Sequence, residues 1–277
     1  MSMRLIYITR DPAVATIAQE IGVDWIFVDL EYRGKDQRQA ARDTVISRHS
    51  VADVENIRGV LTTSQLLVRI NPLGPWSAEE IDAVIVAGAD IVMLPYFKTA
   101  EDVAGFLELV AGRARTCLLL ETMGAIADLD RILGLPGIDF VHVGLNDIHI
   151  ERNTTFMFEF FADGSMDAVA ARLRAGNQLF GIGGMARIGA FLPPAERILA
   201  EHFRLGSTGV ILSRSFCSPK QAKGTDEFRA LFALGVAEVR KQEAWLAEQP
   251  PEFFESNRRQ LIREIYQVVE QIRSRKT

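Results

Sequence analysis

The chain has few of the features that mark secreted, membrane-bound or nucleic-acid-binding proteins. Only two of its 277 residues are cysteines, Cys117 and Cys217, which argues against a disulfide framework. No apolar run approaches membrane-spanning length, and the first residues, MSMRLIYITRDP, lack the apolar core of a signal peptide. The formal net charge is −5, and the aromatic residues are not interleaved with basic runs, so we expect neither nucleic acid nor an acidic membrane as a partner. A soluble cytoplasmic protein is the simplest expectation.

Short apolar runs alternate with amphipathic segments along the whole chain. Runs of this kind, bounded by turn residues, are typical of strands buried on both faces of a parallel sheet. Eight are predicted, at residues 4–9, 24–31, 65–70, 90–95, 116–121, 138–147, 178–184 and 208–213. Eight strands alternating with helices over about 250 residues predict a TIM (β/α)8 barrel. An open doubly wound sheet would usually carry a glycine-rich loop after its first strand, where this chain has TRDP, so the barrel is favoured.

Residues 1–250 are expected to form the barrel, and residues 251–277 a C-terminal helical extension. That extension places Leu261, Ile265 and Val269 on one apolar stripe. A helix is also predicted to start at Ser77, with Ser77 as its cap and Glu80 three residues later.

Acidic residues follow three of the predicted strands. Asp29 and Glu31, with Tyr32 beside them, end the second strand, while Glu121 ends the fifth and Asp147 ends the sixth. In a parallel α/β protein the carboxyl ends of the strands form the ligand-binding edge. Carboxylates there favour a divalent cation, since hard cations prefer oxygen ligands. Two solvated acids at loop starts are the alternative interpretation.

Arg69 interrupts the apolar run Leu67–Ile70 of the third strand. A buried guanidinium is costly unless it is paired. It can therefore be held by Asp29 or Glu31, or be directed at an anionic ligand oxygen, and the two roles are compatible.

The loops after the seventh and eighth strands have the composition of an anion site. They read GGMARIG (183–189) and SRS (213–215), where Arg187, Ser213 and Arg214 are candidate donors to an anionic substrate tail. A tight turn with surface serines is equally consistent with this pattern. His49 and His149 fall in predicted rim loops, where either could exchange protons near neutral pH.

The stretch LLLETMGAIADLDRILGLPGIDFVHVGLNDI resembles the metal-binding core of the HpcH/HpaI aldolase/citrate lyase family, with ET in strand five and a G-x-x-D turn after strand six. FVDLE, VRINP and GADIVMLPYFKTAEDV are similar to the family's strands two to four. The resemblance spans roughly residues 4–215. It implies a barrel of the pyruvate/phosphoenolpyruvate type, whose members make or break carbon–carbon bonds next to a 2-oxo acid, using Mg²⁺, Mn²⁺ or Co²⁺.

By position, the resemblance makes Glu121 and Asp147 the metal ligands and Arg69 the contact of the keto oxygen. Gly144 and the backbone amides of Asn146 and Asp147 would then hold the substrate carboxylate. The enolate would be stabilised by the metal and by Arg69, while a base moves the proton on the neighbouring carbon. The resemblance also implies a homo-oligomer, because terminal helices in this family commonly exchange between subunits.

The chain departs from the family's pattern at two positions. Tyr32 stands where the aldolase branch has the histidine of its general base, and Leu119 replaces the usual glutamine. The leading hypothesis is thus a metal-dependent lyase acting on a 2-oxo acid and an anionic or sugar-derived partner, with Asp29, Glu31, Tyr32 and Arg69 as its catalytic group. The alternatives are a CoA-ester lyase, a non-catalytic ligand-binding barrel and, through Lys98, a Schiff-base aldolase.

Overall fold

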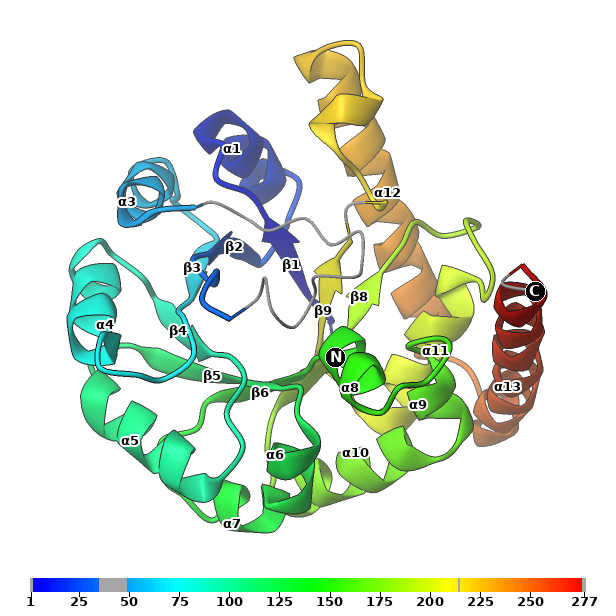
Figure 1. Ribbon diagram of the computed structural model, residues 1–277. Coiled ribbons are helices and arrows are strands. Elements are labelled where there is room, and N and C mark those ends of the chain that lie inside the picture. The colour runs from blue at the N-terminus through cyan, green and yellow to red at the C-terminus, as the bar shows by residue number, and fades with distance from the viewer. Residues whose placement is uncertain (1, 35–48, 214, 276–277) are drawn as a thin grey trace. The chain divides into compact units, whose positions relative to one another are not determined.

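The computed structural model describes residues 2–34, 49–213 and 215–275. Its strands form one nine-stranded sheet in the order β7-β6-β5-β4-β3-β2-β1-β9-β8. The pairings from β1 through β5, and the pairing between β8 and β9, are parallel. Strands alternate with helices, so the fold is an α/β barrel of the TIM type followed by further helices, as the sequence predicted (Figure 1). Within the described ranges no helix is long and apolar enough to cross a membrane.

The chain divides into two compact units, Ile6–His142 and Met1–Leu5 with Val143–Thr277, called here the N-terminal and C-terminal units. The strands of the first part of the chain are β1 (Arg4–Ile8), β2 (Trp25–Asp29), β3 (Gln65–Arg69), β4 (Ile91–Leu94), β5 (Arg115–Leu120) and β6 (Phe140–Val143). Its helices are α1 (Pro12–Glu20), α3 (Val51–Arg58), α4 (Ser77–Val86), α5 (Ala100–Val110), α6 (Met123–Ala127) and α7 (Leu129–Leu133). Strands β2 and β4 are buried along their whole length, which explains their uninterrupted apolar sequences.

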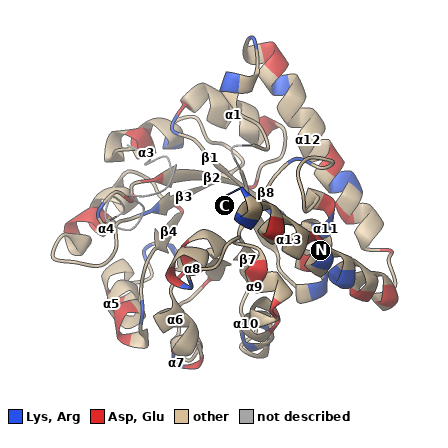
Figure 2. Ribbon diagram, turned by 45° about the vertical axis from the view of Figure 1, so that its right-hand side comes forward, with Lys and Arg blue, Asp and Glu red and all other residues tan. Residues whose placement is uncertain are grey.

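The C-terminal unit contains the remaining elements. They are α8 (Leu145–Glu151), α9 (Glu159–Ala162), α10 (Ser165–Ala175), β7 (Phe180–Ile182), β8 (Gly184–Met185), α11 (Ala195–Leu205), β9 (Gly209–Leu212), η1 (Pro219–Gln221), α12 (Thr225–Leu246) and α13 (Pro251–Ser274). Acidic and basic residues are mixed along α12 and α13, so neither helix presents charge of one sign (Figure 2).

The seventh predicted strand is divided, which raises the strand count from eight to nine. Gly183 lies between β7 and β8 with a φ of +46°, a left-handed conformation that interrupts a strand. Its N–H still donates to the carbonyl of Val143, and its carbonyl accepts from Ile211. The backbone ladder therefore continues through the kink.

The predicted cap of α4 was wrong. Ser77 is the first residue of the helix, its cap position is Trp76, and the Ser77 hydroxyl accepts a hydrogen bond from the N–H of Gly74. Glu80 turns away from the helix start and accepts two hydrogen bonds from Asn71. The spacing of a capping box was present, but a buried asparagine outside the helix competes for the acid.

The last helix, α13, packs on α11 of the same chain. It buries Leu261, Ile265 and Val269 of the predicted stripe, and Asn257 donates to the carbonyl of Arg197 at 3.1 Å. An ion pair of 2.9 Å between Arg197 and Glu264 adds to this contact. A domain boundary at residue 250 stays a prediction.

Candidate active site

The centre of the candidate site is Arg69, the last residue of β3. Its Nε and Nη2 atoms each donate to a carboxylate oxygen of Asp29 at 2.8 Å, and its Nη1 atom lies 3.2 Å from Glu31 Oε2. Asp29 and Glu31 are both only 2% exposed. The register explains the contact, because β2 and β3 are parallel neighbours and Asp29 lies directly opposite Arg69. The predicted pairing of Arg69 with the acids of strand two is present.

Three of the five N–H groups of Arg69 make these contacts. The other two have no partner among the residues that the structure describes. Burial lowers the pKa of Arg69, but the charges of Asp29, Glu31 and Glu121 outweigh it and hold the pKa above its usual value. The guanidinium thus stays protonated and fixed in direction, as a donor to a developing negative charge must be.

Glu121 directly follows β5 and is 3% exposed. Its Oε1 atom accepts the N–H of Tyr96 at 3.0 Å. Tyr96 has a φ of +53°, a left-handed conformation that is uncommon for a bulky side chain and that aims its amide at the acid. Sequence spacing gave no sign of this support, since Tyr96 looks like an ordinary residue after a strand.

A buried asparagine that the sequence analysis did not single out as functional holds the loop after β2. The side-chain oxygen of Asn71 accepts the N–H groups of Tyr32 and Arg33, at 3.0 and 2.9 Å. Asn71 is in turn held by Glu80, with Nδ2 donating to Oε1 at 2.6 Å. Burial raises the pKa of Glu80, an effect that its hydrogen bonds from Asn71 and the charge of Arg33 partly offset.

Tyr32, which stands where the family has its histidine, is 51% exposed. The guanidinium carbon of Arg33 lies 5.2 Å from the centre of the Tyr32 ring and 4.3 Å from that of Trp76. Among the contacts with described residues, Arg33 has no carboxylate within ion-pair distance, so its charge is available to an anionic ligand.

His49 lies against the end of β2, as its predicted position in a rim loop requires. Its Nδ1 atom accepts the backbone N–H of Asp29 at 3.1 Å. A neutral ring in this contact carries its proton on Nε2. His49 is thus a hydrogen-bond donor in its neutral form, adjacent to the acid that holds Arg69.

The remaining predicted residues lie in the C-terminal unit. Gly144 is the cap of α8, and Asn146 and Asp147 occupy its first turn, where backbone N–H groups have no partner within the helix. Leu145 fixes α8 against Gly183, because a Cβ atom on that glycine would lie 2.9 Å from the Leu145 side chain.

The predicted donors after β8 and β9 separate into two places. Arg187 lies 3.9 Å from Glu238 of α12, a distance too long for a hydrogen bond. The Ser213 and Ser215 hydroxyls are 2.7 Å apart and line an apolar cavity with Gly184. Arg214 lies outside the described residues. Of the other histidines, His202 is buried and bonded to Ser207, His142 is buried in β6, and His149 contacts Thr154.

Metal ligation by three or more side chains is not seen: within the described ranges, no group of three His, Cys, Asp or Glu residues is arranged to hold an ion. Carboxylate oxygens, such as those of Glu121 and Asp147, are the donors that Mg²⁺ takes in proteins, where the ion keeps several waters and accepts further oxygens from its substrate.

Comparison with known proteins agrees with this geometry. Residues 5–155, more than half of the chain, match the family model described as HpcH/HpaI aldolase/citrate lyase. The chain belongs to the HpcH/HpaI aldolase/citrate lyase family. A lyase or aldolase activity is what this membership implies. The matched region contains Asp29, Glu31, Arg69, Glu121 and Asp147.

Solved structures show the same fold. An HpcH/HpaI aldolase from Desulfitobacterium hafniense DCB-2 is 15% identical with a TM-score of 0.59, over 90% of this chain and 95% of that one. An HpcH/HpaI aldolase/citrate lyase family protein from Burkholderia cenocepacia J2315 is 16% identical with a TM-score of 0.61, over 88% and 95%. The comparison with curated proteins found no match.

Proposed function

We propose that this chain is a divalent-metal-dependent carbon–carbon lyase that acts on a 2-oxo acid through its enolate. The observation that carries the proposal is the arginine at the end of β3, held by two buried acids with two N–H groups left over from these contacts. An arginine fixed in this way already points its free donors at the place where a substrate oxygen gains negative charge during the reaction. The side chain therefore does not have to reorient when that charge develops.

Glu121 and Asp147 are the proposed ligands of Mg²⁺, Mn²⁺ or Co²⁺. Each follows the carboxyl end of a strand, β5 and β6, and these strands are neighbours in the sheet. The bound cation would polarise the ketone and carboxylate oxygens of the 2-oxo acid. Gly144 and the first-turn amides of Asn146 and Asp147 would bind the substrate carboxylate, as helix N-termini do.

Proton transfer is assigned to the end of β2. Tyr32 is half-exposed, and its phenolic hydroxyl can donate a proton to a reacting oxygen. His49 is the second candidate, because its contact with the Asp29 amide fixes which ring nitrogen carries the proton.

The reaction partner is proposed to be anionic or sugar-derived. Arg33 supports this, since the Asn71 contact fixes its backbone and two aromatic rings lie beside its guanidinium. Arg187, Ser213 and Arg214 are further proposed contacts of an anionic tail. A homo-oligomer is also proposed, and light scattering of the full chain would measure its mass.

Exchange of the methyl protons of pyruvate in deuterated water tests the proposal without knowledge of the partner. We expect exchange in the presence of Mg²⁺, Mn²⁺ or Co²⁺, loss of exchange with a chelator, and loss in Arg69→Lys. Arg58→Lys is the matched control, because Arg58 forms a partly exposed pair with Asp90 before β4. A folded protein with no exchange under any of the three metals would contradict the proposal.

A non-catalytic ligand-binding barrel is the second candidate, favoured by the tyrosine at position 32. It predicts that pyruvate binds in a manner dependent on Arg69 but that its methyl protons do not exchange. Binding measured by calorimetry beside the exchange experiment separates the two.

A further inference from the structure

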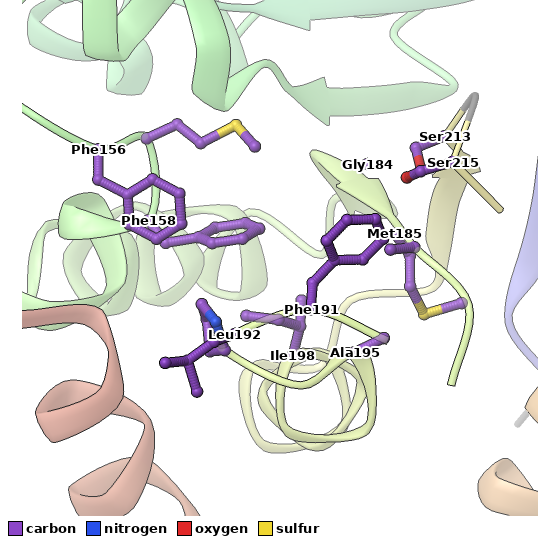
Figure 3. Close-up of a pocket in the computed structure, with 13 residues that line it drawn as sticks. Phe156, Phe158, Gly184, Met185, Phe191, Leu192, Ala195, Ile198, Ser213 and Ser215 are labelled. Atoms are coloured by element: carbon purple, nitrogen blue, oxygen red, sulfur yellow. The ribbon is translucent and has the colours of Figure 1, made fainter. Parts of the chain in front are cut away.

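A cavity of about 280 Å³ lies within the C-terminal unit, at the carboxyl ends of β8 and β9. Its walls come from the segment before α9, the loop before α11, and α11 itself (Figure 3). Of its thirteen lining residues, all within the described part of the chain, eleven are apolar or glycine, two are serines, and none is charged. Apart from the two serines, these residues offer no polar group to a ligand.

Aromatic rings form much of the wall. Phe156 and Phe158 meet edge to face with ring centres 5.2 Å apart, and Phe191 faces the same space from the opposite loop (Figure 3). Aromatic rings in this arrangement can make further stacked or edge-to-face contacts with the ring of a ligand. Met157 and Met185 add flexible, polarisable side chains that adapt to an aromatic ligand.

Phe191 has a strained backbone conformation and an exposed side chain. It is 68% exposed, and its φ of +69° is left-handed, a conformation that bulky side chains rarely adopt. Leu192 next to it is 41% exposed. Exposed apolar side chains that border a cavity are typical of binding sites rather than of ordinary surface.

One end of the cavity is polar. The Ser213 and Ser215 hydroxyls, 2.7 Å apart, share one hydrogen bond, so the pair can still donate one proton and accept others. A ligand with a single hydroxyl or carbonyl group would satisfy them.

We propose that this cavity binds a small, uncharged aromatic molecule, or the aromatic end of a larger one, that carries one hydroxyl or carbonyl group. The size agrees, because cavities of about 150 Å³ hold benzene and drug-sized ligands need roughly 300 Å³ or more. A single six-membered ring with a short substituent lies between these limits. The proposal does not depend on the lyase activity.

Ligand-observed NMR titration of the full chain tests the site with benzyl alcohol as the probe, in the absence of metal and 2-oxo acid. We expect a dissociation constant of about 1 mM or below, near the efficiency of small fragments. Benzoate, with the same ring and a charge, is expected to bind at least tenfold more weakly, because none of the lining residues that the structure describes offers a counter-charge.

The Phe191→Ala variant is expected to weaken benzyl alcohol binding at least fivefold. Leu234→Ala is the matched control, since Leu234 is 52% exposed on α12 and does not line the cavity. If Phe191→Ala does not fold, Ser213→Ala serves instead and is expected to reduce the preference for benzyl alcohol over toluene. Equal affinity for benzyl alcohol and benzoate would overturn the proposal. So would unchanged binding of benzyl alcohol by both Phe191→Ala and Ser213→Ala. A third contradicting result is a solution mass that halves in Phe191→Ala, because the exposed Phe191 would then belong to an interface between copies of the chain.

A second arm distinguishes a substrate ring from a separate ligand. Benzaldehyde with pyruvate would give 4-hydroxy-2-oxo-4-phenylbutanoate if the ring belongs to the reaction partner. The methyl carbon of pyruvate loses a proton and bonds to the aldehyde carbon, and the aldehyde oxygen takes up a proton. Benzaldehyde that binds without this product indicates a separate ligand, and failure of pyruvate exchange leaves the binding result intact.

Discussion

Both carboxylate oxygens of Asp29 accept a hydrogen bond from the guanidinium of Arg69, at 2.8 Å each, across two adjacent parallel strands. This two-point contact fixes the plane of the guanidinium as well as its position. A lysine can supply the charge but not the plane. Three predictions concern this pair and the acids beside it, and a fourth concerns the loop that follows β2.

Replacement of Arg69 by lysine should reduce pyruvate exchange by about 10²–10³-fold, the usual effect of removing one donor from a developing oxyanion. The ammonium group keeps a charge near Asp29, so the protein should remain folded. Exchange rate constants measured at saturating metal provide the test. An effect no larger than that of Arg58→Lys would show that Arg69 is only structural.

Replacement of Asp29 by alanine should lower the free energy of unfolding by about 1–3 kcal/mol, because two buried N–H groups of Arg69 lose their acceptor while Glu31 still balances part of the charge. Urea denaturation followed by circular dichroism measures this. Asp82→Ala is the comparison, since Asp82 pairs with Arg113 at 2.7 Å but is 60% exposed, and exposed pairs contribute about 1 kcal/mol or less.

Replacement of Glu121 by glutamine should weaken binding of Mn²⁺ at least tenfold. The amide keeps an oxygen for the N–H of Tyr96, so the fold should survive while a ligand charge is lost. Titration of Mn²⁺ followed by electron paramagnetic resonance gives the affinity. Glu108→Gln, on α5, controls for charge alone, and equal affinities for the two variants would remove Glu121 from the metal site.

Stability should depend on pH through Glu80. Its pKa is raised by burial above the ordinary value of 4.5, so the folded protein binds more protons than the unfolded chain just above that pH. The stabilisation from protonated Glu80 is complete below pH 4.5 and is lost as pH rises through the folded pKa. Relative to Glu80→Gln, the wild type should thus lose stability as pH rises from 4.5 towards neutrality.

Urea denaturation at several pH values gives this difference. Glu79→Gln, one residue earlier and exposed, is the control. A difference between wild type and Glu80→Gln that stays constant with pH would contradict the assignment.

The sequence was informative where chemistry and strand position coincide. An arginine inside an apolar run requires a partner, and the acids ending the preceding strand were the natural candidates, so the Arg69 cluster could be predicted. The roles of Asn71 and Tyr96 could not, because an asparagine that accepts backbone N–H groups and a left-handed tyrosine leave no periodic pattern. The aromatic cavity depends on two loops that meet only in the folded chain.

Gly183 and Leu145 carry a last consequence. A Cβ atom on the glycine would come within 2.9 Å of the leucine side chain, and the glycine has a backbone conformation that other residues adopt at a cost. A larger residue there would strain the main chain between β7 and β8 and force the side chain of Leu145, the first residue of α8, to move. Substitution of Gly183 should therefore disturb the start of the helix that bears Asn146 and Asp147.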